Sequence, residues 1–471
     1  MPTIVSSKHL DYVDEVRLTR FHWILLLGIT LAQILDGYDF QITSYALPGF
    51  TKEFGLDAGQ AGSVAAAGNF GLLIGAIVFS QLADRWGRKP VFQVVLFDYA
   101  LGSLLSAFAP NFGVLVTARF IAGLGIGAEF PVAFALLAEL TPRKWRSMFV
   151  PLGPIMYGVG FIVAGLSSIF VILPFGWRDG FLIGVLPALI IIYVRAFLPE
   201  SVRFLVQKGR LEEATRVVQR IARSAGQVFS VPADSPIVVQ EQARVPMRPY
   251  WNAILMLGGL IALRSISDYG VGAFLPQIFA SQGYELLRAF TYTLLISGIQ
   301  PLAQLFGGWF QDRVTQRRTA LWATLWAGAV LNFAFAMTIF FKGPVELAVA
   351  FQVLATLIGG GYVAIYYTLG TELFPTSIRS AAVGWETAIG RTGAVLGPLL
   401  LGILASTGLP FATILTFWYV PAFLAGLIPF LGLRAVTRNR NLEATAQAVV
   451  EPAGTGPVAS VAPGVAPVGE R

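Results

Sequence analysis

Long apolar segments recur along the 471-residue chain and are separated by short polar stretches. A helix needs about 20 apolar residues to cross roughly 30 Å of hydrocarbon. Twelve segments meet this length, and we predict that each is a transmembrane helix. They cover residues 21–43, 59–83, 90–109, 113–139, 147–173, 178–198, 249–280, 286–311, 319–341, 345–372, 379–407 and 410–434. The pattern therefore predicts an all-α integral membrane protein.

Three segments lie outside these helices. Residues 1–20 form an N-terminal segment, and residues 199–248 form the one long internal loop, which links a six-helix bundle at 21–198 to a second at 249–434. The tail at 435–471 is rich in Ala, Val, Pro and Gly, and we expect it to be disordered. No signal peptide is expected, because no small-residue cleavage site follows a short apolar core near the beginning of the sequence.

The composition excludes several classes of site. Hydrophobic residues make up 55% and charged residues 13% of the chain, and the mean hydropathy is +0.69. A soluble domain has about 25% charged residues. Because there is no cysteine and only His9 and His22, disulfides, thiolate chemistry and a multi-histidine metal site are excluded. No Walker A sequence occurs, and we expect neither enzymatic activity nor a cofactor.

The net charge of +7 would suit nucleic-acid binding, but its distribution along the chain favours a membrane topology. If the N-terminus is cytoplasmic, 26 of the 33 Lys and Arg residues fall in cytoplasmic segments. Four fall on the opposite side: Lys52, Arg178, Arg288 and Lys342. Three lie inside predicted helices: Arg119, Arg264 and Arg391. By the positive-inside rule, we predict a plasma (inner) membrane protein with both termini and the long loop in the cytoplasm and no nucleic-acid partner.

Two short sequences occur twice. ELTPRKWRS at 139–147 returns as ELFPTSIRS at 372–380, and DRWGRK at 84–89 returns as DRVTQRR at 312–318. The offsets of 233 and 228 residues indicate that helices one to six and seven to twelve are parallel repeats. Parallel six-helix halves build transporters that rock around a site near the midplane of the membrane.

The charged residues of these repeats are candidates for a conformational latch. Asp84 and Asp312 each end a predicted helix beside several arginines, where ion pairs can form in one transport state and break in the other. The alternative is that the arginines only fix topology, but acidic residues contribute little to that rule. The predicted latch comprises Asp84, Arg85, Arg88, Glu139, Arg146, Asp312, Arg313, Glu372 and Arg379.

Four motifs in order resemble the major facilitator superfamily over residues 20–435. They are QLADRWGRKP, where Ser80 precedes the motif at a position usually occupied by glycine, RFIAGLGIGAEFP, LPESVRFLVQKGR and GTELFPTSIRSAAVGWETAIGRTGAVLGP. The PES sequence resembles a signature shared by sugar porters and aromatic-acid symporters. DGYD at 36–39 and GRTG around Arg391 resemble the aromatic-acid and metabolite:proton symporters, including nicotinate carriers. That resemblance implies functional roles for Asp36, Asp39, Arg119 and Arg391.

Ionisable residues inside the membrane are costly and usually mark a pathway. At about 1.5 Å per residue, Asp36, Arg119, Arg264 and Arg391 all lie about 18–22 Å from the cytoplasmic side. We therefore predict a substrate and proton pathway formed by Asp36, Asp39, Arg119, Arg264, Asp268 and Arg391. Separate structural ion pairs, such as Asp36 with Arg119, are the alternative. Asp98 is expected to be structural or at the lipid boundary, and Glu129, nearer the cytoplasmic end, to belong to the latch.

Two motifs inside the predicted helices have structural explanations. GLGIGA at 123–128 fits a dinucleotide-binding pattern, but it lies within an apolar helix with no preceding strand, so it predicts close helix packing. Asn69 lies near the middle of its helix, and we expect it to hydrogen-bond a neighbouring helix.

Three arginines facing one cavity favour a small organic anion, because guanidinium groups bind carboxylates in bidentate fashion. The nearby acids can take up a proton, so we predict a proton symporter for a small carboxylate. The resemblance adds aromatic carboxylates as candidate substrates, and we expect the transporter to be a monomer. A sugar or polyol symporter is the alternative, although ALRSISDYGVGAFLPQIF at 262–279 replaces the Gln-rich stretch of sugar porters. A transporter-like sensor is a third reading, which the short loop and tail disfavour.

Overall fold

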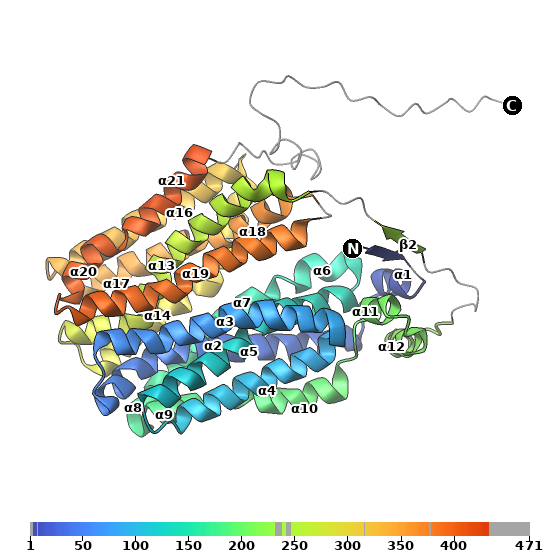
Figure 1. The fold of residues 1–471 in the computed structure, drawn as a ribbon, viewed down its shortest axis with the longest axis horizontal. Coiled ribbons are helices and arrows are strands. Elements are labelled where there is room, and N and C mark those ends of the chain that lie inside the picture. Colours follow the sequence, from blue (N-terminus) through green and yellow to red (C-terminus); the bar gives the residue numbers. More distant parts are fainter. Residues whose placement is uncertain are drawn as a thin grey trace, which may run out of the picture.

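The structure is a computed structural model, and it describes residues 3–6, 8–230, 238–241, 246–314, 316–375 and 378–432. Within these ranges, eleven helices are long and apolar enough to cross a membrane. The predicted disordered tail at 435–471 lies outside the described residues. The prediction of an all-α membrane protein built from two six-helix bundles is confirmed, and Figure 1 shows one bundle in blue to green and the other in yellow to red.

Seven of the spanning helices are continuous. They are α2 (Arg20–Phe54), α3 (Ala58–Trp86), α4 (Arg88–Ala107), α5 (Phe112–Leu140), α13 (Trp251–Ser281), α16 (Arg317–Phe340) and α19 (Arg379–Ser406). The first is longer than predicted, because the residues after Thr43 continue the helix through Pro48 to Phe54. This extension is held by packing: a Cβ added at Gly49 would lie 2.8 Å from the Trp177 ring.

The other spans are interrupted. They are α7 (Leu152–Ser167) with a π-turn and α8 (Leu173–Phe175), α9 (Trp177–Ile183) with α10 (Pro187–Phe197), α14 (Leu286–Gly298) with α15 (Gln300–Arg313), α17 (Val345–Leu354) with a π-turn and α18 (Tyr362–Leu373), and α20 (Phe411–Trp418) with α21 (Val420–Gly432). The predicted span at 286–311 breaks at Ile299, one residue before α15, which carries Pro301 in its first turn. Because each piece is short, this span is absent from the eleven.

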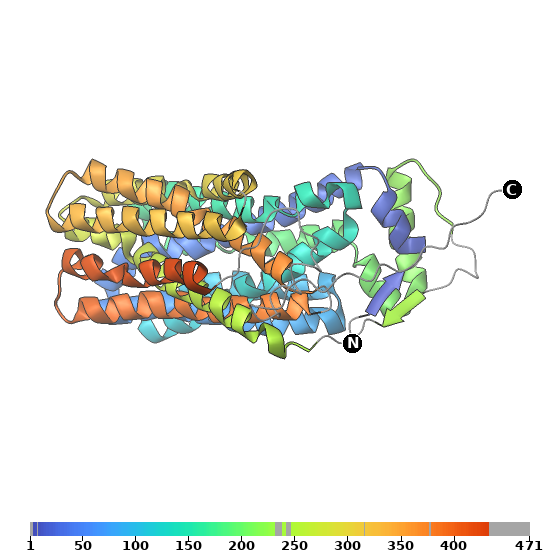
Figure 2. The same cartoon turned by 90° about the horizontal axis from the view of Figure 1, so that it is seen from above.

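The N-terminal segment and the long loop fold together, which the sequence did not predict. They contribute α1 (Lys8–Glu15), α11 (Val202–Gln207), α12 (Leu211–Ser224) and the antiparallel strands β1 (Thr3–Ser6) and β2 (Val238–Glu241). His9 lies 2.8 Å from the Thr215 hydroxyl, and Tyr12 donates to Gln227 at 2.6 Å. Figure 2 shows these elements, here called the end cap, beyond one end of the helices.

Both bundles share a hydrophobic core at one end of the molecule only. There, Tyr45 and Phe50 of α2 belong to the same cluster as Phe274 of α13, Phe290 of α14 and Leu401 of α19. At the end that carries the end cap, two separate clusters cover residues 13–225 and 250–425. The bundles are therefore joined at one end and packed independently at the other, and in Figure 1 their ribbons diverge toward the end cap.

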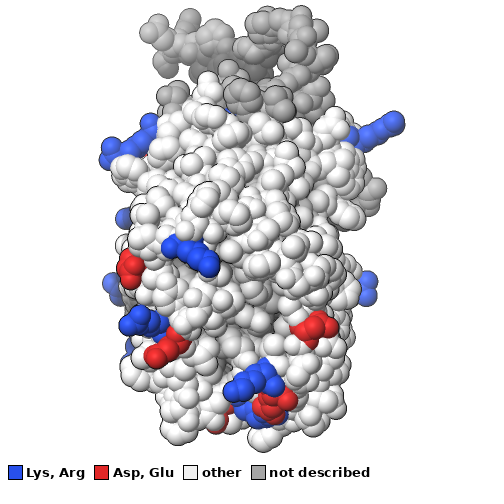
Figure 3. Space-filling view, turned by 90° about the vertical axis from the view of Figure 1, so that its left-hand side faces the viewer, with Lys and Arg blue, Asp and Glu red and all other residues white. Residues whose placement is uncertain are grey.

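The joined end has few charges. Among the described residues its basic side chains are Lys52, Arg178, Arg288 and Lys342, and Figure 3 shows a largely uncharged surface there. We call the other end the basic end, because the remaining described arginines and lysines outside the helix interiors gather at it, with α6 (Arg143–Phe149) and the end cap.

The glycine motif of α5 packs this helix closely against α3 and α4, as predicted. A Cβ added at Gly123 would lie 2.0 Å from the Gly68 carbonyl, and one at Gly127 would lie 2.0 Å from the Leu72 carbonyl. Gly125 faces α4 instead, where an added Cβ would meet Tyr99 at 2.7 Å. Such approaches are possible only without a side chain, and they fix the position of Arg119 on α5.

Candidate functional site

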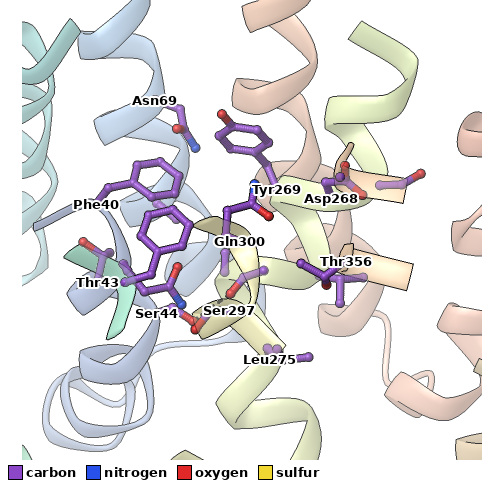
Figure 4. A pocket seen from close by; sticks show the side chains of 18 of the residues that line it. Phe40, Thr43, Ser44, Asn69, Asp268, Tyr269, Leu275, Ser297, Gln300 and Thr356 are labelled. Atoms are coloured by element: carbon purple, nitrogen blue, oxygen red, sulfur yellow. Dashed lines mark hydrogen bonds between the residues drawn. The ribbon is translucent and has the colours of Figure 1, made fainter. Parts of the chain in front are cut away.

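A cavity of about 270 Å³ lies between the two bundles. Helices α2, α3, α5 and α7 line it from the first bundle, and α13 to α18 line it from the second. Figure 4 shows Phe40, Thr43 and Asn69 projecting from one side and Asp268 and Tyr269 from the other. Small-molecule pockets measure about 300–1,000 Å³, so this one suits a compact ligand such as a single ring.

One wall of the cavity is aromatic. The ring of Phe40 stacks on Phe161 at 5.9 Å, lies 6.1 Å from Tyr157 and meets the edge of Tyr269 at 5.6 Å. Tyr269 comes from α13, so this cluster joins the two bundles across the cavity. Aromatic faces and edges favour another flat ring, which can stack or pack edge to face.

Arg264 is the cation of the second bundle that reaches the cavity. It is 2% exposed, and its Nε donates to Asp268 at 2.8 Å, one helical turn further along α13. Its guanidinium lies 5.8 Å from the Tyr362 ring, and its Nη1 has no hydrogen-bond partner among the described residues. Arg264 and Asp268, both predicted for the pathway, thus form an ion pair with each other, and Nη1 of the guanidinium stays unpartnered among the described residues.

Arg119 also borders the cavity, but its two Nη atoms already bind Asp39. Nη1 donates to one carboxylate oxygen at 3.2 Å, Nη2 donates to the other, and Ser103 adds a hydrogen bond at 2.6 Å. The guanidinium also lies 5.0 Å from the Phe181 ring. Arg119 therefore pairs with Asp39, and not with Asp36 as the structural alternative from the sequence supposed.

Asp36 is fully buried and faces the carboxyl group of Glu129. Glu129 is also fully buried, between α2 and α5, and accepts a hydrogen bond from Gln33 at 3.2 Å. The prediction that Glu129 belongs to the latch is wrong, because its side chain points toward α2 and not toward the basic end. Its burial beside another acid was not visible in the sequence, since it depends on how α5 is rotated.

Arg391 lies on α19, half-buried and outside the described lining of the cavity. It is close enough to Tyr157, Tyr269 and Tyr367 to interact with them electrostatically. Two of these tyrosines line the cavity, so Arg391 stands directly behind the aromatic wall.

Several polar residues of the cavity were missed. Asn332, Gln352 and Tyr419 line it, and each has a buried polar atom without a hydrogen-bond partner among the described residues. Amides within long apolar segments were the available signal, and only Asn69 was considered. As predicted, Asn69 bonds a neighbouring helix, donating to the Ala394 carbonyl of α19 at 3.0 Å.

The repeated charges form equivalent clusters at the basic end. In the first bundle Arg88 lies 3.1 Å from Asp84 and 3.5 Å from Glu139. In the second bundle the corresponding arginine is Arg317, 3.4 Å from Asp312 and 3.5 Å from Glu372. Arg317 was not among the predicted residues.

Other members of the predicted latch have different surroundings. Arg313 lies over the Trp309 ring at 4.5 Å, and Arg85 is exposed. Arg146 binds Asp14 near the end of α1 and the Thr141 carbonyl, and its repeat counterpart Arg379 donates to the Phe374 carbonyl at 3.2 Å. In the described state, the ion pairs of the two clusters each lie within one bundle.

A charged, aromatic cavity between two pseudo-symmetric helical bundles, with repeated charge clusters at one end, is the architecture of a secondary transporter. Comparison with known families agrees. The chain belongs to the sugar (and other) transporter family of the major facilitator superfamily, whose family profile matches residues 25–447. It is a multi-pass membrane transporter of small molecules and not an enzyme, and the resemblance inferred from its motifs is confirmed.

Curated relatives carry different substrates. The chain is 32% identical to the niacin transporter NiaP of Acinetobacter baylyi, over 83% of this chain and 88% of that protein. It is 30% identical to the benzoate transport protein of the same organism, over 89% and 91%. It is also 30% identical to the 4-hydroxybenzoate transporter PcaK of that organism, over 89% and 93%.

Solved structures share the fold. The inward-open xylose transporter XylE of E. coli superposes with a TM-score of 0.71 at 18% identity, covering 91% of this chain and 100% of that chain. A bacterial homologue of the human lysosomal transporter Spinster superposes with a TM-score of 0.67 at 15% identity, covering 93% and 100%.

Proposed function

We propose that this protein is a proton symporter that takes up a small aromatic carboxylate by alternating access. The observation that carries the proposal is the guanidinium of Arg264, buried in an aromatic cavity with Nη1 unpartnered among the described residues. Relatives named as niacin, benzoate and 4-hydroxybenzoate transporters support the same chemistry.

The binding mode follows from the two cations near the cavity. Arg119 is neutralised by Asp39, whereas Arg264 shares only its Nε with Asp268, whose side chain is one-third exposed to the cavity. A carboxylate that accepts from Nη1 of Arg264 gains a charge-assisted hydrogen bond. Its ring then faces the group formed by Phe40, Phe161 and Tyr269. Arg391, behind this wall, is the second cation that the substrate meets when the bundles move.

Asp36 is proposed to carry the coupling proton. It is buried in the first bundle, and no donor among the described residues neutralises it. A proton bound there accompanies the anion, so that the membrane potential does not oppose uptake of the negative charge. Asp39 is proposed to act through Arg119, which borders the cavity.

The transport cycle is proposed to be a rocking of the bundles at 21–198 and 249–434, connected by the loop at 199–248. We place the basic end, with both termini, on the cytoplasmic side of the plasma (inner) membrane, because it carries most of the basic residues. The cavity then faces the cytoplasm in this state, since the shared core closes the other end. The Arg88 and Arg317 clusters act as latches that exchange partners when the basic end closes, and the transporter works as a monomer.

The alternative of a sugar or polyol symporter is weaker. The polar residues Gln300, Asn332 and Gln352 would suit hydroxyl groups, but a sugar has no charge for Arg264. A sensor that binds without transport is also disfavoured, because the end cap packs on the first bundle and offers no separate effector domain within the described residues.

Uptake into proteoliposomes tests the proposal. Purified protein is reconstituted with a pH gradient, acid outside, and offered radiolabelled nicotinate, benzoate, 4-hydroxybenzoate or xylose. At least one acid should accumulate with the gradient above the level reached in protein-free liposomes, which take up permeant acids passively, and xylose should not. Accumulation of xylose alone would establish the sugar alternative, and saturable binding of an acid without any flux would support the sensor.

A further inference from the structure

Asp36 of α2 and Glu129 of α5 form a pair of buried acids. Both residues are 0% exposed, and their carboxyl groups lie within hydrogen-bonding reach of each other. No N–H or O–H of the described residues donates to either oxygen of Asp36 or to Oε2 of Glu129. The amide of Gln33 donates to Oε1 of Glu129 at 3.2 Å.

Among the described residues, the groups around this pair do not supply a counter-charge. Asp39, one turn further along α2, is itself an acid, and the guanidinium of Arg119 on α5 is bound to it through both Nη atoms. Tyr99 on α4 is close, but its hydroxyl donates to the Leu35 carbonyl at 2.5 Å. Tyr157 on α7 also faces Asp36. Three acids thus lie around one arginine in this part of the first bundle.

Two ionised carboxylates in contact inside a protein repel each other strongly, and burial strengthens the repulsion. One proton placed between them turns the repulsion into a short, charge-assisted hydrogen bond. Such a pair takes up and releases protons as a unit, and neither member can be replaced without changing the behaviour of the other.

We propose that Asp36 and Glu129 together form the proton-binding site of the transporter, with the coupling proton shared between their carboxyl groups. The inference rests on the proposed symport and deepens it by adding Glu129 to the mechanism. Sequence resemblance assigns no role to Glu129.

The position of the pair explains how a proton and an anion can be coupled. The pair lies outside the described cavity lining, but Asp39 and Arg119 connect it to the cavity wall. An anion in the cavity adds negative charge on the far side of Arg119, which favours a proton on the pair. By linkage, a bound proton favours the anion to the same degree.

The test compares Glu129→Gln, Asp36→Asn and the double variant with Asp98→Asn as matched control. Asp98 is a half-buried acid of α4 in the same bundle, outside the proposed site. In proteoliposomes with the pH gradient and the acid that the wild type accumulates, the first three variants should accumulate no more acid than protein-free liposomes do. Asp98→Asn should keep the wild-type ratio. Exchange of internal for external acid should remain within about twofold of wild type in all four, because exchange requires no proton release.

Gradient-driven accumulation by Glu129→Gln at the wild-type ratio would overturn the shared site and leave Asp36 alone. A double variant that loses exchange although both single variants keep it would also overturn the shared site. If the two acids act as one unit, replacing the second acid should add no further defect to replacing the first. Should Glu129→Gln not assemble, Glu129→Met, of similar volume and equally unable to ionise, replaces it with the same expectations.

Infrared difference spectroscopy of the substrate-free protein separates failure of this inference from failure of the proposed function. The wild type should show a pH-dependent C=O band of a protonated carboxylic acid that the double variant lacks and Asp98→Asn retains. If no acid is transported but this band is present, the symport proposal fails and the shared proton site stands. If acids accumulate and the band is unchanged in the double variant, the shared site is wrong.

Discussion

Arg264 and Arg391 are both cations that a transported carboxylate can meet, and their surroundings differ. Arg264 lines the cavity with Nη1 unpartnered among the described residues, whereas Arg391 stands behind Tyr157 and Tyr269. Lysine keeps the charge but lacks the planar fork that serves Asp268 and a ligand at once. Arg264→Lys should therefore lower the affinity for the transported acid by about 1.5–3 kcal/mol, roughly tenfold or more.

Isothermal titration with the detergent-solubilised protein measures this loss. Arg391→Lys, at a residue for which the sequence resemblance implies a functional role, should lose less affinity in this state than Arg264→Lys. Arg178→Lys is the matched control, because Arg178 pairs with Glu53 at the joined end, away from the cavity. Unchanged affinity in Arg264→Lys would argue against a carboxylate held by this residue.

Asp39 and Arg119 form an ion pair that is almost completely inaccessible to solvent. Removing one partner of such a pair leaves a buried charge uncompensated, which costs roughly 3–5 kcal/mol. Asp39→Asn should therefore lower the thermal unfolding temperature markedly, and Asp39→Asn combined with Arg119→Gln should recover part of the loss. Thermal-shift assays in detergent measure both. A double variant as unstable as the sum of its parts would show that the two side chains are not coupled.

At the scale of helices, the transmembrane spans and the end cap show which features of the fold the sequence can predict. Eleven predicted spans correspond to helices of spanning length, because a run of about 20 apolar residues is by itself a sufficient signal. The twelfth broke at Ile299, since Pro301 lies just beyond it, and the helical end cap was missed because α1 and α12 are stabilised by each other. Arg264 was predicted from its depth in the helix. Glu129 was assigned to the latch incorrectly, and Asn332 and Gln352 were not assigned at all, because hydropathy does not reveal which way a helix is rotated.

The clusters at the ends of α3, α4 and α5 and of α15, α16 and α18 are built from equivalent residues and should have equivalent effects. Arg88 and Arg317 each hold two acids at the basic end. We predict that Arg88→Gln and Arg317→Gln each slow uptake several-fold while the affinity for the acid stays within about twofold, because the clusters govern the exchange between states. Uptake rates and binding titrations on the same preparations check this. A folded variant that no longer binds the acid would contradict the role of the cluster as a latch.

The contact between α1 and α12 should depend on pH through His9. Burial lowers the pKa of His9 below its ordinary value of about 6.5. The unfolded segment then binds a proton more readily than the docked one, so the docked form is most stable above about pH 6.5 and loses stability as the pH falls below it. Hydrogen exchange of residues 8–15, corrected for its intrinsic pH dependence, should be faster at pH 5.5 than at 7.5. His9→Asn should remove this difference, and an equal difference in that variant would assign it to another group.

At the scale of the whole molecule, the shared core at the joined end and the separate cores at the basic end define one of the two conformations that alternating access requires. At the joined end α3 and α19 approach so closely that a Cβ added at Gly402 would lie 3.2 Å from Gly62. Movement to the opposite state must separate these helices, while the Arg88 and Arg317 clusters approach one another. Transport of any substrate thus requires that this end opens.

The absence of cysteine from the chain allows that requirement to be tested directly. A Cβ added at Gly59 of α3 would lie 3.6 Å from the Ser406 hydroxyl oxygen at the end of α19, the atom whose place a cysteine sulfur would take, so the two side chains are direct neighbours. The variant with Gly59→Cys and Ser406→Cys should form a disulfide on mild oxidation and lose all uptake, because the joined end can no longer open. Reduction should restore uptake, and each single cysteine variant should transport in both conditions. Binding of the acid by oxidised, solubilised protein should persist, since the cavity remains accessible from the basic end. Uptake by the oxidised double variant at the wild-type rate, with the cross-link verified by mass spectrometry, would show that the bundles do not separate there.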